Sequence, residues 1–228
     1  MVASIVIAFL LGTLTPVIAR RFGKILPADP GHIVLKLWHF PHFPKVNDVA
    51  RSRLLYQKWM HLCWGSLLWG MGLTIIALCA TFLLPQGVDM WAILFITLVG
   101  FCIQVDRRYC LLPDFFTIPL LIAGFGMAAC VPELTPVDSV IGAIFGYLVA
   151  VVAVMIMRRS RQSEIGSGDV KMMAALGAWL GASGLNFALI LSFFLFAIPA
   201  SLNGHRQGPY GPALGIAGII AFFLVYIG

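Results

Sequence analysis

The chain has 228 residues, of which 61% are hydrophobic and 11% are charged, and its formal net charge is +6. A soluble domain is nearer half apolar and a quarter charged, so this composition excludes an ordinary soluble fold. Nor does the positive charge indicate a nucleic-acid partner, because the basic residues fall between hydrophobic runs and form no patch with interleaved aromatic residues. The apolar runs predict an all-α, polytopic membrane protein that forms one compact membrane domain.

Eight apolar segments follow one another along the chain and predict about eight transmembrane helices. Their approximate limits are 1–19, 59–84, 88–105, 115–131, 137–157, 169–182, 184–202 and 211–228. The segment at 169–182 is short for a full span, and Gly181, Ser183 and Gly184 supply a turn after it. A single span over residues 169–202, which would give seven spans in all, stays open.

The basic residues predict which side of the membrane each loop occupies. With eight spans, all fifteen lysines and arginines fall on one side, and the short loops opposite carry only Glu133. The positive-inside rule therefore makes the basic side cytoplasmic. We divide the chain into a first transmembrane helix at 1–19, a cytoplasmic loop at 20–58 and a membrane-embedded domain at 59–228. The first helix lacks the positive start of a signal peptide, so we expect it to be retained.

Two aspartates lie at the cytoplasmic edge of this arrangement. Asp106 comes at the end of the third segment, and Asp169 starts the sixth, within Gly166-Ser-Gly-Asp-Val-Lys171. Because a bilayer makes charge expensive, an ionisable residue at its edge is a candidate functional residue. Two facing carboxyl groups that share a proton can hydrolyse a peptide bond, since one activates water while the protonated one polarises the carbonyl. The plain alternative is that each aspartate caps a solvated helix end.

Around these aspartates the chain resembles the type IV prepilin peptidases, also called prepilin leader peptidases. The first matching block begins at Asp106 and continues through the Leu-Pro-Asp that ends at Asp114 into Thr-Ile-Pro-Leu-Leu. The second block is Gly166-Ser-Gly-Asp-Val-Lys171 with the apolar residues that follow. The third, Gly208-Pro-Tyr-Gly-Pro, is similar to a Pro-Phe-Gly-Pro element before the last helix, with Tyr210 in place of Phe. Three blocks in the same order make the resemblance specific.

The resemblance implies a membrane aspartic endopeptidase of Gly-x-Gly-Asp architecture, multi-pass in the bacterial inner membrane, with 59–228 as its peptidase domain. Such enzymes remove the basic leader from type IV prepilins or type II secretion pseudopilins on the cytoplasmic side. The resemblance makes Asp106 and Asp169 the catalytic residues. The residues that match the motifs in a supporting role are Asp114, Gly166, Gly168 and Lys171. The implied partners are the pilin precursor and the lipid bilayer, with no cofactor; the sequence does not indicate an oligomeric state.

The first loop departs from the family pattern. Many members carry two Cys-x-x-Cys pairs there, thought to bind zinc, and also N-methylate the new pilin terminus. Residues 20–58 contain no cysteine, so we expect no zinc site, and N-methyltransferase activity is left open. His39 and His42 fall short of the four ligands of a structural zinc site, and the Trp-, Phe- and Pro-rich residues around them predict a loop against the membrane surface.

Two alternatives to a prepilin peptidase stay open. Presenilin-like and signal-peptide-peptidase-like enzymes share Gly-x-Gly-Asp, but they usually carry Tyr before the first aspartate, where this chain has Val105. An ion-coupled transporter would use Asp106 and Asp169 to bind ions. It would also favour polar residues near mid-span and inverted repeats, and neither is clear in the sequence.

Overall fold

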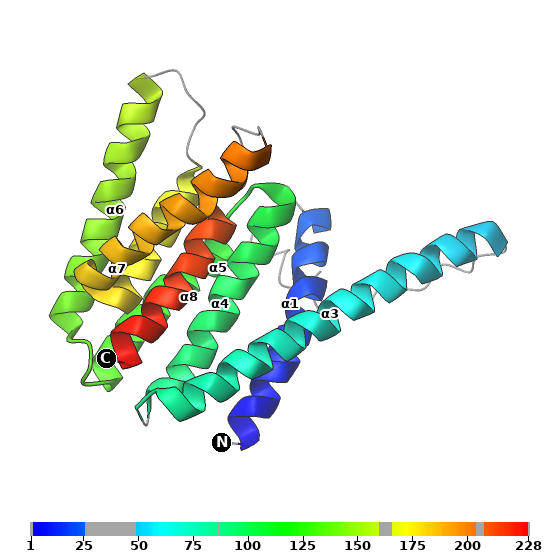
Figure 1. Ribbon diagram of the computed structural model, residues 1–228, viewed down its shortest axis with the longest axis horizontal. Coiled ribbons are helices and arrows are strands. Elements are labelled where there is room, and N and C mark those ends of the chain that lie inside the picture. Colours follow the sequence, from blue (N-terminus) through cyan, green and yellow to red (C-terminus); the bar gives the residue numbers. More distant parts are fainter. Residues whose placement is uncertain (1, 26–48, 86, 160–165, 204–207, 228) are drawn as a thin grey trace. The chain divides into compact units, whose positions relative to one another are not determined.

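The chain is described by a computed structural model over residues 2–25, 49–85, 87–159, 166–203 and 208–227. Over these residues all the regular structure is helical, which confirms the predicted all-α class (Figure 1). The helices are α1 (Val2–Ile25), α3 (Val49–Leu83), α4 (Val88–Tyr109), α5 (Asp114–Cys130), α6 (Pro136–Arg159), α7 (Ser167–Asn203) and α8 (Gly211–Ile227).

Several of these helices have the length and composition of membrane spans. Among the described residues four stretches qualify on both criteria, namely Cys63–Leu83, Val88–Tyr109, Pro136–Ile156 and Gly168–Ser201. Shorter apolar helices cover Ile5–Arg20, Asp114–Cys130 and Gly211–Ile227. This pattern agrees with the predicted polytopic membrane protein, whereas the number of eight spans stays a prediction.

The described chain forms two compact units, residues 1–78 and 79–228. In the first unit α1 packs closely on α3, because a Cβ on Gly12 would lie only 2.8 Å from the Cα of Gly70. Small residues permit such an approach between membrane helices. Helix α1 continues to Ile25 and α3 begins at Val49, so helical structure enters both ends of the predicted loop. His39 and His42 lie outside the described residues.

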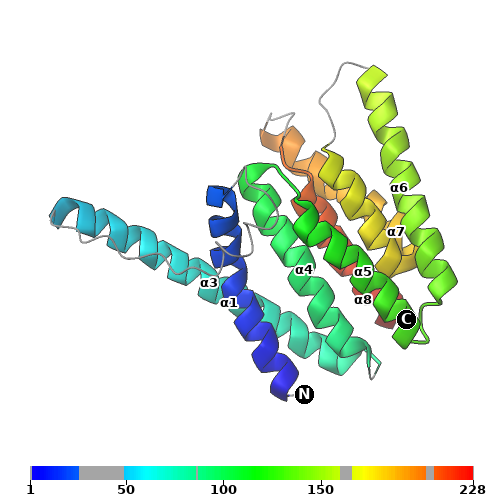
Figure 2. The same cartoon turned by 180° about the vertical axis from the view of Figure 1, so that it is seen from behind.

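The second unit is arranged around α7, which contacts α5, α6 and α8. Helix α8 lies between α4 and α7 in Figure 1, and α5 lies between the same two helices on the opposite side in Figure 2. At the centre, the buried rings of Phe95, Trp179 and Phe222 pack together, with centroids 4.9 Å apart for Phe95 and Trp179 and 4.8 Å apart for Phe95 and Phe222. The Trp179 indole N–H also donates to the carbonyl of Leu120 at 2.7 Å, which ties α7 to α5.

Helix α7 is interrupted at Gly181, where φ is 65° and ψ is 179°. Glycine adopts a positive φ at little cost, whereas a side chain there is strained. The chain therefore reverses, and α7 consists of two arms, residues 167–180 and 182–203. The turn predicted after the sixth segment lies at this glycine. As a result, both ends of α7 lie at the same end of the unit as the connection between α4 and α5 (Figure 1).

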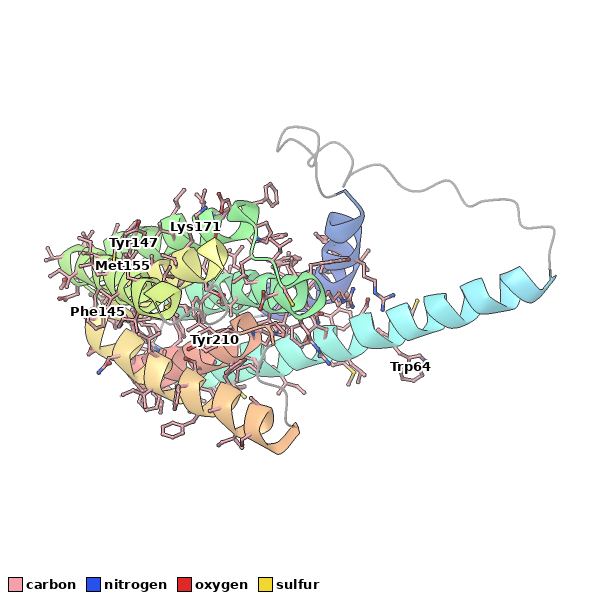
Figure 3. All side chains as sticks on the ribbon, turned by 90° about the horizontal axis from the view of Figure 1, so that it is seen from above. Trp64, Phe145, Tyr147, Met155, Lys171 and Tyr210 are labelled. Atoms are coloured by element: carbon pink, nitrogen blue, oxygen red, sulfur yellow. The ribbon has the colours of Figure 1, made fainter. Side chains whose placement is uncertain are left out.

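The outer surface of the second unit is apolar. On α6 the large side chains of Leu148, Val152 and Ile156 are more than half exposed, and those of Tyr147 and Met155 lie on the outside of the unit (Figure 3). A soluble monomer rarely exposes so continuous an apolar face. Lipid chains would cover it, which is what a membrane protein requires.

Candidate functional site

Asp106 lies in the last turn of α4 and is buried, with 5% of its surface exposed. Its side-chain Oδ2 accepts a hydrogen bond from the backbone N–H of Gly211, the first residue of α8, at 2.9 Å. The first N–H groups of a helix have no partner within the helix, and the helix dipole favours negative charge beside them. The start of α8 therefore holds one oxygen of this carboxyl group in place.

Gly211 is the residue that makes this contact possible. A Cβ at position 211 would lie 2.6 Å from Oδ2 and 2.9 Å from Cγ of Asp106. Such distances are too short for non-bonded atoms, so any side chain would displace either the carboxyl group or the helix. The spacing of Gly211 and Gly215 predicts close helix packing, but the contact of Gly211 with Asp106 was not predicted, although its place in the third block at the start of an apolar segment was a signal.

Asp169 lies in the first turn of α7, and it is only partly exposed. Its backbone N–H donates to the carbonyl of Gly166 at 3.0 Å, so the glycine turn is joined to the helix that follows. Asp169 and Asp106 are close enough for their charges to interact. The two aspartates that the sequence singled out, far apart along the chain, thus lie within electrostatic range of each other in the second unit.

The two glycines before Asp169 have different surroundings. Gly168 is buried against the connection between α4 and α5, and a Cβ there would lie 2.5 Å from the Cβ and 2.6 Å from the carbonyl oxygen of Leu112. Gly166 is exposed, and a Cβ there would meet nothing closer than 3.8 Å, which is Oδ2 of Asp169. Gly168 therefore permits the close approach of two motif blocks, whereas Gly166 contributes its backbone carbonyl.

Lys171 forms an ion pair with Asp114, with Nζ 2.5 Å from Oδ1. The pair joins the N-terminal part of α7 to the first turn of α5, and so connects the second motif block to the first. The two side chains are 43% and 56% exposed, so water screens the pair and its contribution to stability is about 1 kcal/mol at most. Its geometric effect is to hold the starts of the two helices together.

Tyr210 stands directly before Gly211 and contacts α7. Its hydroxyl is 2.5 Å from Oγ of Ser192, and its ring meets that of Phe196 edge to face, with centroids 5.5 Å apart. Burial raises the pKa of the Tyr210 hydroxyl above its usual value, the bond with Ser192 opposes the rise, and the nearby charge of Asp169 adds to it. The hydroxyl is therefore protonated at neutral pH.

The two carboxyl groups suit acid–base chemistry. No cluster of three or more His, Cys, Asp and Glu suited to a metal ion occurs among the described parts of the chain. Two carboxyl groups close together can hold one proton between them, and such a pair can both remove a proton from water and donate one to a substrate. One carboxyl is fixed by a backbone N–H, which is the preorganisation that such catalysis needs.

Comparison with known proteins identifies relatives of this chain. Residues 92–201 match the sequence profile of the type IV leader peptidase family. The chain is 40% identical over 125 residues to the prepilin leader peptidase/N-methyltransferase of Aeromonas salmonicida (strain A449), a match that covers 51% of this chain and 43% of that protein. It is 38% identical over 130 residues to the protein of the same name from Dichelobacter nodosus, over 55% of this chain and 45% of that one.

A shorter relative is covered more fully. Leader peptidase HopD of Salmonella typhimurium is 37% identical over 131 residues, which are 53% of this chain and 84% of that protein. The chain thus spans less than half the length of the two relatives above and most of the length of this one. No solved structure matches the chain significantly.

Proposed function

We infer the function from the fact that the chain belongs to the type IV leader peptidase family. We propose that it is a membrane aspartic endopeptidase that removes the basic leader peptide from type IV prepilins or type II secretion pseudopilins. The single observation that carries the aspartic mechanism is that Asp106 and Asp169 lie within electrostatic range of each other, with Asp106 held by the N–H of Gly211. N-methylation of the product is not part of the proposal, because no described residue argues for it.

In the proposed reaction the two aspartates share one proton. The ionised carboxyl takes a proton from a water molecule, whose oxygen attacks the carbonyl carbon of the scissile peptide bond. The protonated carboxyl donates its proton to the carbonyl oxygen, which forms a neutral tetrahedral intermediate. When the carbon–nitrogen bond breaks, the carboxyl that took the proton from water gives it to the leaving nitrogen. The other carboxylate takes a proton from a hydroxyl group of the intermediate, so the pair again holds one proton. No metal or cofactor is needed for this sequence.

We place the site at the cytoplasmic face of the bacterial inner membrane. The support is the distribution of basic residues, which all lie on one side of the predicted eight-span arrangement, the same side as both aspartates. The starts of α5 and α8, both ends of α7 and the end of α4 gather at one end of the second unit, so a substrate in the adjacent aqueous phase would reach the pair there (Figure 1).

The test is co-expression with a prepilin that carries a basic leader and a Gly-Phe junction. The wild-type chain should shorten the prepilin, whereas Asp106→Asn and Asp169→Asn should each slow cleavage by about 10²- to 10⁴-fold and still be recovered in the membrane fraction. The matched control is Asp89→Asn, because Asp89 lies in the first turn of the same helix α4, at the opposite end from Asp106. Cleavage by Asp106→Asn or Asp169→Asn at the wild-type rate would refute the proposal.

A further inference from the structure

We propose that Tyr210 is a positioning residue for the aspartate pair: through its hydrogen bond with Ser192 it fixes the turn whose next residue, Gly211, holds Asp106. The inference rests on the proposed function, since it concerns the rate at which the pair cleaves a peptide. It concerns a hydroxyl group that none of the three sequence motifs required, because Phe stands at this position in the element that the third block resembles.

Ser192 binds the Tyr210 hydroxyl from the interior of the second unit. This serine is fully buried in the second arm of α7, and its hydroxyl donates to the carbonyl of Leu189 at 2.8 Å. Either hydroxyl group can be the donor in the bond between Ser192 and Tyr210. In both directions the Tyr210 hydroxyl is bound to α7. Its part in catalysis is accordingly to hold a position and not to transfer a proton.

The ring of Tyr210 is held by the same part of α7. Ser192 and Phe196 are four residues apart, and side chains with this spacing lie on one face of a helix. One therefore binds the hydroxyl while the other packs against the ring. Tyr210 lies at the start of α8, beside the second arm of α7 (Figure 3). These two contacts anchor the residue directly before α8 to α7.

The anchored position is transmitted to Asp106 through one peptide bond. The N–H of Gly211 belongs to the planar peptide group that joins it to Tyr210, so the two residues move together. That N–H is the group that donates to Asp106 at 2.9 Å. Tyr210 is also near enough to Asp169 for that charge to act on it. Tyr210 is therefore linked to Asp106 through the Gly211 N–H and lies within range of the charge of Asp169, so a shift of about 1 Å in its place would misalign the pair.

The test measures cleavage of a prepilin leader peptide by the purified full-length chain in detergent micelles. Tyr210→Phe retains the ring contact and removes only the hydroxyl, and Ser192→Ala removes the other end of the same bond. Each should lower kcat about fivefold, the factor expected for one hydrogen bond, and leave KM within about twofold. Because both substitutions break one bond, the double variant should be no slower than the slower single variant.

The matched control is Tyr226→Phe. Tyr226 is also buried and lies near the other end of α8, where its hydroxyl donates to the carbonyl of Trp179 at 2.8 Å. Loss of the Tyr226 hydroxyl group removes an equivalent hydrogen bond about 24 Å along the helix from Tyr210. This distance is too great to affect the aspartate pair, so kcat should stay at the wild-type value. The comparison separates positioning of the pair from a general loss of packing.

The possible outcomes distinguish failure of the inference from failure of the proposed function. An unchanged kcat for Tyr210→Phe, multiplied losses in the double variant, or an equal loss in Tyr226→Phe would each overturn the inference and leave the proposed function standing. A wild-type chain that leaves the peptide intact would overturn the proposed function itself, and the inference with it. A fall in kcat confined to Tyr210→Phe and Ser192→Ala supports both.

Discussion

Replacing Gly211 by alanine tests whether the start of α8 holds the Asp106 carboxyl group. In an uncrowded helix this substitution raises the free energy of unfolding by up to about 1 kcal/mol, because alanine has less conformational freedom than glycine in the unfolded chain. Here the new Cβ would lie 2.6 Å from Oδ2, 2.9 Å from Cγ and 3.0 Å from Cβ of Asp106. Normal contact is about 3.5–4.0 Å, so the two groups must separate by about 1 Å. The hydrogen bond of 2.9 Å would then be lost.

The expected cost has two parts. A hydrogen bond to a charged group contributes about 1.5–3 kcal/mol, so the folded state should lose about that amount and not gain from the substitution. A misplacement of about 1 Å costs up to about 10²-fold in rate, so kcat should fall by at least about tenfold. Because the crowding affects only the contact between position 211 and the Asp106 carboxyl group, KM should change less than kcat.

The assay compares Gly211→Ala with Gly72→Ala in cleavage of a prepilin leader peptide and in thermal unfolding in detergent. Gly72 lies within α3, and a Cβ there would have no atom within 4 Å, so its substitution should leave cleavage unchanged and should not lower the unfolding temperature. Cleavage by Gly211→Ala within about twofold of the wild-type rate would refute the argument that this N–H positions the aspartate.

Further substitutions probe three other features of the second unit, namely the glycines before Asp169, the ion pair and the turn of α7. Gly168→Ala should lower both the unfolding temperature and kcat, because its Cβ would lie 2.6 Å from a backbone oxygen. Gly166→Ala should change the unfolding temperature little, because its Cβ would have no neighbour closer than 3.8 Å. A larger fall in unfolding temperature for Gly166→Ala than for Gly168→Ala would contradict the different roles given to the two glycines. Lys171→Met and Asp114→Asn should each cost about 1 kcal/mol or less in unfolding free energy, and a double-mutant cycle should give a coupling that shrinks with salt. Gly181→Ala should cost about 1–2 kcal/mol through its positive φ, and a neutral effect in a thermal melt would show that the turn tolerates a side chain.

The sequence predicted the parts of the fold that depend on local composition. The length of the apolar runs predicted the membrane helices. The glycines at the end of the sixth segment predicted a turn, which the structure has at Gly181. The sequence did not predict the parts of helices that extend beyond the apolar runs. Hydropathy predicts which residues lie in the lipid, and it does not predict whether the polar residues beside them are helical. Helix α3 begins at Val49, ten residues before the predicted span, in a stretch that is helical but rich in charged and polar residues.

The candidate site was predictable only in part. Counting the spans placed Asp106 and Asp169 at one membrane edge, and the structure brings their charges within range of each other. The contact between Gly211 and Asp106 could not be read from the chain, since it joins residues that only the packing of α4 against α8 brings together. The bond between Ser192 and Tyr210 depends in the same way on the reversal of α7. Such contacts are decided by helix packing, which periodicity and spacing do not specify.

The central claim is that Asp106 and Asp169 act as one catalytic unit, and a kinetic double-mutant cycle tests it most directly. The purified wild type, Asp106→Asn, Asp169→Asn and the double variant would each be incubated with a prepilin leader peptide, and the rate of cleavage at the leader junction would be followed by mass spectrometry. Residues that act as a unit give non-additive losses, so each single variant should be as slow as the double variant. Wild-type cleavage by either single variant, or a double variant whose loss is the product of the two single losses, would contradict the account.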